Sequence, residues 1–211
     1  MGFDEGRLEV AAPELRSLCP ESHRSLHVAA PNLSELIWHF HDYDPARHQF
    51  AEEAGRHLRR LVTSTNRPEA ALMRRFDVVD ELNVRVSIAK GTEEYERYLE
   101  DIKNLSKCQV LVVTLTDIEH PLMPTVLHLL AKCVGTRKLV VDLRFTEDYP
   151  CKSSGCPCAW QGKPNKIALD TLEEIEVKGH DSDLKVELMR LLCRCSYMVQ
   201  KKVSITVHTQ S

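Results

Sequence analysis

The stretch CKSSGCPCAW, from Cys151 to Trp160, gathers three cysteines within eight residues. Zinc in a structural site takes four cysteine or histidine ligands, which usually come in pairs two to four residues apart. Cys151, Cys156 and Cys158 supply only three, and the C-x4-C-x-C spacing is atypical of a zinc hairpin. A zinc site would therefore need a fourth ligand from a more distant position, for which the candidates are His180, Cys193 and Cys195.

The alternative interpretation of this stretch is a rigid loop of Gly, Pro and Cys whose thiols stay free. We favour it, because short motifs often match by chance, and we expect no cofactor and no stoichiometric metal. Three thiols this close could also form an oxidative disulfide during handling. The chain has eight cysteines, and its first residues, MGFDEGRLEV, lack the features of a secretory leader. These features predict a reducing compartment, either cytoplasmic or nuclear, and a chain that is not secreted.

A second group with metal-binding chemistry lies in WHFHDYDPARH, residues 38–48. Its imidazoles and carboxylates resemble a hydrolase metal cluster: His39, His41, Asp42, Asp44 and His48. The alternative is a solvated strand end, followed by a turn at Asp44-Pro45. We favour this alternative because no comparable ligand set follows downstream, where His120 and His128 are isolated. The chain is therefore not expected to be an enzyme, and no catalytic residue is assigned.

Composition and motifs argue against several other classes of function. The formal net charge is −3, so no global basic field would attract nucleic acid. One basic cluster, diluted by Glu52, Glu53 and Glu69, is interpreted as solvated surface: Arg56, Arg59, Arg60, Arg67, Arg74 and Arg75. Glycine-rich nucleotide-binding motifs and the G-x-S-x-G hydrolase motif do not occur in the sequence. An apolar run of about eighteen residues, which a membrane-spanning helix needs, does not occur either.

Three aromatic residues are candidates for contacts with a protein partner, because aromatic side chains are enriched at binding hot spots. Trp160 lies in the polar cysteine loop, and Tyr149 lies just before it. Trp38 is the third candidate, and its sequence context is equally compatible with a buried position in the core.

The chain repeats itself near its N-terminus. RLEVAAPELRSL, residues 7–18, is echoed by SLHVAAPNLSEL, residues 25–36, with seven identical positions at a constant offset of 18. Each copy has an alternating apolar stretch, then Pro, then L-x-x-L. The alternation predicts a short strand in each copy, and the proline predicts where it ends.

Farther along, five segments rich in Val, Ile, Leu and Thr predict longer strands: 80–88, 108–116, 136–145, 172–179 and 201–208. Their anchors, Leu82, Leu111, Leu139, Ile175 and Val203, are 29, 28, 36 and 28 residues apart. Helical spacing of apolar residues predicts helices within 92–105, 120–133 and 181–195, with Thr92 as the N-cap of the first.

Strands and helices that alternate at this period are typical of leucine-rich repeats. The predicted fold is an α/β solenoid with a parallel sheet and with helices on the convex side. A compact doubly wound α/β domain, with helices on both faces of the sheet, is the alternative. The one long spacing, 36 residues, contains the cysteines. We therefore expect them in an insertion loop that replaces the convex helix of its repeat, outside the core.

Several segments resemble a known family. LHVAAPNLSELIW, LLAKCVGTRKLVVDLRF, CKSSGCPCAW and IALDTLEEIEVKG are similar to plant F-box/leucine-rich-repeat proteins of the grass type that carry a C-terminal FBD domain. The pattern L-x-x-L-E-E-I-E-V, followed by E-L-M-x-L-L, places the FBD-like part at about 167–207. The expected organisation is short irregular repeats over 1–79, longer units with the cysteine loop over 80–166, and an FBD-like cap over 167–211.

The resemblance implies a non-enzymatic module that binds an unknown protein. In the family this part recognises substrates of a cullin-RING ubiquitin ligase. The F-box itself does not occur in this sequence, so binding to the ligase adaptor is not expected. One alternative is an F-box-less decoy that shields substrates from full-length relatives, and another is a zinc-binding protein. Neither nucleic acid nor a membrane is an expected partner.

Overall fold

The computed structural model describes most of the chain. The described residues are 7–20, 25–39, 42–65, 67–132, 135–144, 151, 155–159, 171–179, 183, 186–191 and 204–209. Within this part of the chain no helix is long and apolar enough to cross a membrane.

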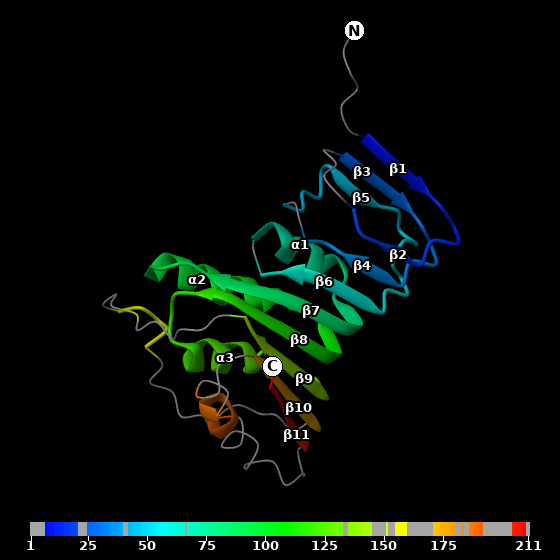
Figure 1. The fold of residues 1–211 in the computed structure, drawn as a ribbon. Helices are drawn as coiled ribbons and strands as arrows, with labels where there is room; N and C mark the ends of the chain where they lie inside the picture. Colours follow the sequence, from blue (N-terminus) through cyan, green and yellow to red (C-terminus); the bar gives the residue numbers. More distant parts are fainter. Residues whose placement is uncertain are drawn as a thin grey trace.

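The described residues form two parallel sheets and helices (Figure 1). The smaller sheet has the order β1-β3-β5, with β1 (Arg7–Ala11), β3 (Ser25–Ala29) and β5 (His48–Phe50). The larger sheet has eight strands, in the order β11-β10-β9-β8-β7-β6-β4-β2. These strands are β2 (Ser17–Leu18), β4 (Glu35–Ile37), β6 (Arg60–Ser64), β7 (Val78–Ile88), β8 (Lys107–Ile118), β9 (Lys138–Leu143), β10 (Glu174–Gly179) and β11 (Ser204–Thr209). The helices are α1 (Arg67–Arg75), α2 (Thr92–Asp101), the 3-10 helix η1 (Ile102–Asn104) and α3 (Leu122–Leu130).

The expected α/β class with parallel strands is confirmed. Every strand pair is parallel, so the chain must cross over between successive strands of a sheet. Strands of the two sheets alternate along the chain from β1 to β6, and the helices supply the crossovers from α1 onward. The sequence predicts a boundary between short and long repeats at residues 79 and 80. Strand β7 spans these two residues, so the larger sheet continues across them.

The N-terminal sequence repeat matches the register in which the strands pair. Leu8 pairs with Leu26 and Val10 with Val28 in the smaller sheet. The same offset of 18 recurs in the larger sheet, where Leu18 pairs with Leu36. Identical residues therefore stack on one another in adjacent strands.

A row of leucine and isoleucine side chains crosses the larger sheet in register. Its members are Leu18, Leu36, Leu61, Leu82, Leu111, Leu139, Ile175 and Ile205. The expected anchors at Leu82, Leu111, Leu139 and Ile175 are confirmed. The last anchor was wrong by two residues, because Ile175 pairs with Ile205 and Val203 lies outside the described residues.

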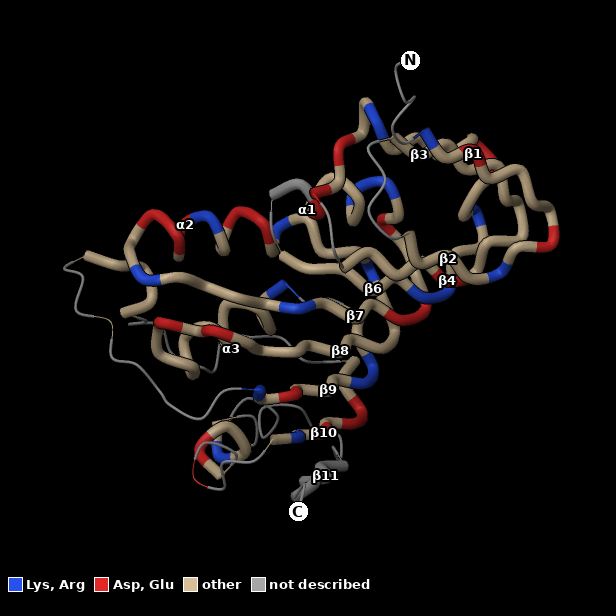
Figure 2. Tube along the Cα trace, turned by 45° about the horizontal axis from the view of Figure 1, so that its top comes forward, with Lys and Arg blue, Asp and Glu red and all other residues tan. Residues whose placement is uncertain are grey.

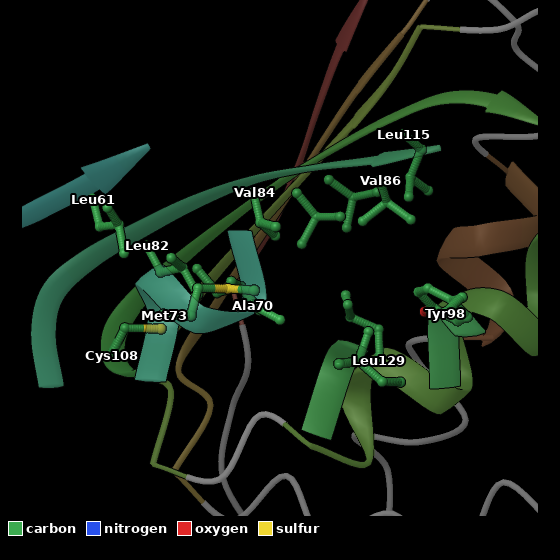
Figure 3. Close-up of a cluster of buried hydrophobic side chains, with 14 of the residues drawn as sticks. Leu61, Ala70, Met73, Leu82, Val84, Val86, Tyr98, Cys108, Leu115 and Leu129 are labelled. Atoms are coloured by element: carbon green, nitrogen blue, oxygen red, sulfur yellow. The ribbon is translucent and has the colours of Figure 1, made fainter. Parts of the chain in front are cut away.

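The core lies between the larger sheet and the helices. Figure 3 shows Leu82, Val84 and Leu115 pointing from the strands toward residues of α1, α2 and α3, among them Met73 and Leu129. The buried side chains form one hydrophobic cluster that extends from Leu26 to Leu191. The helices are also joined to one another, since the hydroxyl of Tyr98 in α2 donates to the carbonyl of Thr125 in α3 at 2.8 Å.

Helices α2 and α3 follow the predicted spacing with small shifts at their ends, whereas α1 was not predicted. Thr92 is the first residue of α2 and not its N-cap, since that position is Gly91 with φ of 125°. Only glycine adopts such a backbone conformation readily. Helix α3 begins at Leu122, directly after Pro121. The third predicted helix is described in part, and residues 186–191 are helical.

A pair of valines on β7 tests the assignment of the core. Val84 is 0% exposed and Val78 is 64% exposed. We expect Val84→Ala to lower the free energy of unfolding by about 2–3 kcal/mol, because it removes two buried methyl groups and leaves a cavity. Val78→Ala is the matched control and should change it by less than about 0.5 kcal/mol. Urea unfolding measures both, and equal effects would contradict this placement of the core.

Candidate functional site

One face of the larger sheet turns away from α1, α2 and α3. Successive side chains of a strand point to opposite faces. The residues that precede and follow each member of the leucine and isoleucine row along its strand therefore form this second face, which we call the open face. Three rows of the open face lie in register across the strands. The charged row is Glu35, Arg60, Glu81, Val110, Lys138 and Glu174. The apolar row is Ile37, Val62, Asn83, Val112, Val140 and Glu176. The third row is Ser64, Arg85, Thr114, Asp142 and Lys178.

Ion pairs join neighbouring strands along the charged row. Arg60 on β6 bonds to Glu35 on β4, and its Nε donates to Oε1 of Glu81 on β7 at 2.8 Å. The hydroxyl of Ser17 donates to Oε2 of Glu35 at 2.6 Å. This hydroxyl and then Arg60 lower the pKa of Glu35, and the two carboxylates raise the pKa of Arg60. Partly exposed pairs add at most about 1 kcal/mol each, so their main effect is to orient the side chains of the row.

Three of the six arginines in the basic cluster of the sequence form ion pairs. Arg56 pairs with Glu52 at 2.7 Å, and Arg59 pairs with Asp80 at 2.9 Å. Arg60 belongs to the charged row already described. Figure 2 shows Lys and Arg interspersed with Asp and Glu along the described chain. These pairs leave less free positive charge than the sequence suggests, and free charge is what attracts a phosphate backbone.

The group at residues 38–48 forms an aromatic cluster. Trp38 is 3% exposed, and its ring centroid lies 5.5 Å from that of Tyr43 and 4.9 Å from that of His48. The backbone N–H of Asp44 donates to Nδ1 of His48 at 2.9 Å, so this nitrogen is already engaged. His39 is exposed, and these residues are not among the described groups that could hold a metal ion.

Of the three aromatic candidates for contacts with a partner, the structure describes only Trp38. Trp38 is buried in the core, which leaves it no surface for a partner. Of the two roles that its sequence allowed, the core role therefore fits. Tyr149 and Trp160 lie outside the described residues, as does His41, and their roles stay predictions.

The cysteine loop and His120 meet in space. One ligand atom from each of His120, Cys151, Cys156 and Cys158 lies within 4.8 Å of the others. The Sγ of Cys156 is 3.8 Å from Nδ1 of His120. His120 was considered isolated in the sequence, and this was wrong. The three fourth-ligand candidates of the sequence, His180, Cys193 and Cys195, lie outside the described residues.

The expectation that the cysteines lie outside the core was also wrong. Cys156 and Cys158 are 3% and 1% exposed and belong to the hydrophobic cluster, against which the half-buried Cys151 packs. None of the described cysteines forms a disulfide. Burial raises the pKa of the Cys158 thiol, and the neighbouring thiols of Cys156 and Cys151 raise it further. The loop therefore turns its sulfur atoms inward.

The order of the strands explains why His120 lies beside the cysteines. His120 follows β8, and the cysteines follow β9, the next strand of the sheet. The carboxyl ends of adjacent parallel strands lie at the same edge of a sheet. Residues just beyond two such ends are neighbours although 31 or more residues separate them in the chain.

Glu69 on α1 is a buried carboxylate that the sequence placed on a solvated surface. It is 5% exposed, and its Oε2 has no hydrogen-bond partner. Burial raises its pKa to about 7, and the nearby charges of Asp42 and Asp101 add to the shift. Glu69 was expected to dilute the basic cluster, and its burial corrects that interpretation.

Comparisons of the sequence and the fold with protein-family models, curated proteins and solved structures find no match.

The raised pKa of Glu69 predicts a dependence of stability on pH. Between pH 4.5 and about 7 the unfolded chain releases this proton while the folded chain keeps it. The free energy of unfolding should therefore fall as pH rises through this window. Glu69→Gln cannot titrate, so its stability relative to the wild type should rise by about 3 kcal/mol across the window and then level off.

Urea unfolding at a series of pH values measures this difference. Glu96→Gln, at an exposed position of α2, is the control and should show no such rise. A constant difference between Glu69→Gln and the wild type from pH 4.5 to pH 8 would contradict the assignment.

Proposed function

We propose that this chain is a non-enzymatic protein-binding module built as a leucine-rich-repeat solenoid. The observation that carries the proposal is the larger sheet, whose described strands follow one another in chain order. A doubly wound domain reverses its strand order at a switch point. The sequential order β6-β7-β8-β9-β10-β11 therefore favours the solenoid.

The row of leucine and isoleucine residues across the larger sheet supports the same architecture. Each strand of the larger sheet contributes one leucine or isoleucine at the same register position. A repeat of this kind cannot bury its apolar side alone, and it does so by stacking on its neighbours. The described helices α1, α2 and α3 contribute to the core on one face of the sheet (Figure 3), and we assign the partner to the other face.

The open face has the layout of a protein-binding surface. Its apolar row, in which Ile37 and Val112 are half-buried and Val62 and Val140 are buried, lies between the charged row and the third row. Protein interfaces combine an apolar centre with a polar rim. The ion pairs of the charged row, such as that between Lys138 and Glu174 at 2.9 Å, hold the rim residues in place before a partner binds.

The proposed partner is a protein substrate of ubiquitination. This step comes from the resemblance to F-box/leucine-rich-repeat proteins with an FBD domain. In those proteins the repeats recognise the substrate and a separate segment docks on the ligase. The residues that resemble the FBD domain include β10, which adds a strand to the same sheet. The partner would contact the apolar row with its own apolar side chains and the two flanking rows with polar ones.

A photo-crosslinking amino acid at one position on each face tests the proposal. We expect a crosslinker at Val112, on the open face, to capture a specific partner protein from cells. The same group at Glu96, an exposed position of α2 on the helical side, is the matched control and should not capture it. Mass spectrometry of the crosslinked product also reports whether a ligase adaptor is present.

Binding of the captured partner can then be measured with purified proteins. Val112→Asp should weaken it about tenfold or more, because a charge replaces an apolar contact at the centre of the interface. Glu96→Arg should leave it unchanged. Capture from position 96 in place of 112, or equal affinities of the two variants, would refute the open face as the binding surface.

A further inference from the structure

Four side chains with metal-binding chemistry converge in the loops beyond β8 and β9. They are His120, Cys151, Cys156 and Cys158, and their ligand atoms lie within 4.8 Å of one another. In a tetrahedral zinc site with Zn–S bonds of about 2.3 Å, neighbouring ligand atoms are about 3.6–3.8 Å apart. The 3.8 Å between the Sγ of Cys156 and Nδ1 of His120 already has this value. Movements of less than about 1 Å would bring the rest to it.

The hydrogen bonds of His120 set its tautomer. Its Nε2 lies 3.0 Å from the carbonyl oxygen of Ala89, which can only accept. Nε2 therefore carries the proton, and Nδ1 presents its lone pair to the thiols. Histidine ligands of metals usually donate their other ring N–H to a carbonyl or carboxylate in this way. His120 is thus oriented as a ligand before any ion binds.

Burial is the second feature of a structural metal site. His120, Cys156 and Cys158 are 1%, 3% and 1% exposed. The ring of Tyr95 packs at 4.8 Å from that of His120 and shields the cluster further. Gly155 has φ of 77°, a left-handed conformation that favours glycine, and it turns the chain between the first cysteine and the next two.

We propose that His120, Cys151, Cys156 and Cys158 bind one zinc ion in a tetrahedral Cys3His site. Three thiolates and one imidazole are soft to borderline ligands that select zinc, and four protein ligands close the site. A closed site is structural, because it leaves no position for water or substrate. On binding, the three thiols release their protons to solvent and the imidazole stays neutral.

The zinc ion fixes the loop after β9 to the turn between β8 and α3. This segment has no helix among its described residues, whereas α1, α2 and α3 follow the three preceding strands. The metal would anchor the described part of this segment to the core. The inference stands on the cluster alone and does not depend on the proposed protein-binding function.

Metal content and a cobalt titration test the site. The full chain, purified under reducing conditions, should contain one zinc ion per molecule by elemental analysis. Co²⁺ added to the metal-free chain should produce the d–d bands and the sulfur-to-cobalt charge-transfer band of a tetrahedral thiolate site. One equivalent of zinc should then abolish them.

Substitutions assign the ligands. Cys151→Ser and Cys156→Ser should each reduce the retained zinc at least about tenfold, because each removes a ligand. Cys151 is only half-buried, so this variant is the less disruptive of the two for folding. Cys19→Ser, at an exposed cysteine outside the cluster, is the matched control and should keep its zinc. His120→Cys supplies a thiolate in place of the imidazole and should retain metal.

Three results would overturn the proposal. The first is a reduced wild-type chain that neither contains zinc nor binds cobalt. The second is zinc that Cys151→Ser and Cys156→Ser retain as well as Cys19→Ser does. The third is a disulfide among Cys151, Cys156 and Cys158 in the chain isolated under reducing conditions, detected by mass spectrometry after alkylation.

Discussion

The larger sheet depends on one row of leucine and isoleucine residues that lie in register across its eight strands, and the members from Leu36 to Ile175 are buried. A shift of one residue in any strand would turn its apolar side chains to the opposite face. The row therefore aligns the ends of the strands as well as their centres. This alignment places the charged and apolar rows of the open face side by side, and it brings the loops beyond β8 and β9 to the same edge. The proposed binding surface and the thiol–imidazole cluster are both consequences of this register.

The strands β1, β3 and β7 to β11 could be predicted from the sequence, because alternation and a regular spacing are local properties, but the division into two sheets was not predicted. The offset of 18 between the two N-terminal copies even gave the pairing of Leu8 with Leu26. Apolar alternation repeats every two residues, however, so it could not distinguish Val203 from Ile205 as the partner of Ile175. The burial of Glu69 could not be predicted either, since its neighbours in the chain look like those of a surface helix.

The spacing of the cysteine motif identified three of the four residues in the candidate metal cluster. Cys151, Cys156 and Cys158 were recognised as three possible ligands, and the search for a fourth continued downstream along the chain. The fourth is upstream, at the end of the previous strand, and His120 has no cysteine within ten residues of it in sequence. Only the parallel pairing of β8 with β9 makes these residues neighbours. A comparison of the residues that follow adjacent strands would have grouped His120 with the three cysteines, whereas a comparison by distance along the sequence does not.

X-ray absorption at the zinc edge of the purified, reduced full chain tests the central claim most directly, because it reports the ligand atoms themselves. If the register of β8 and β9 assembles the site, the spectrum should show three sulfur neighbours at about 2.3 Å and one nitrogen at about 2.0–2.1 Å. Zinc surrounded by oxygen and nitrogen alone, or by fewer than three sulfur atoms, would contradict the account.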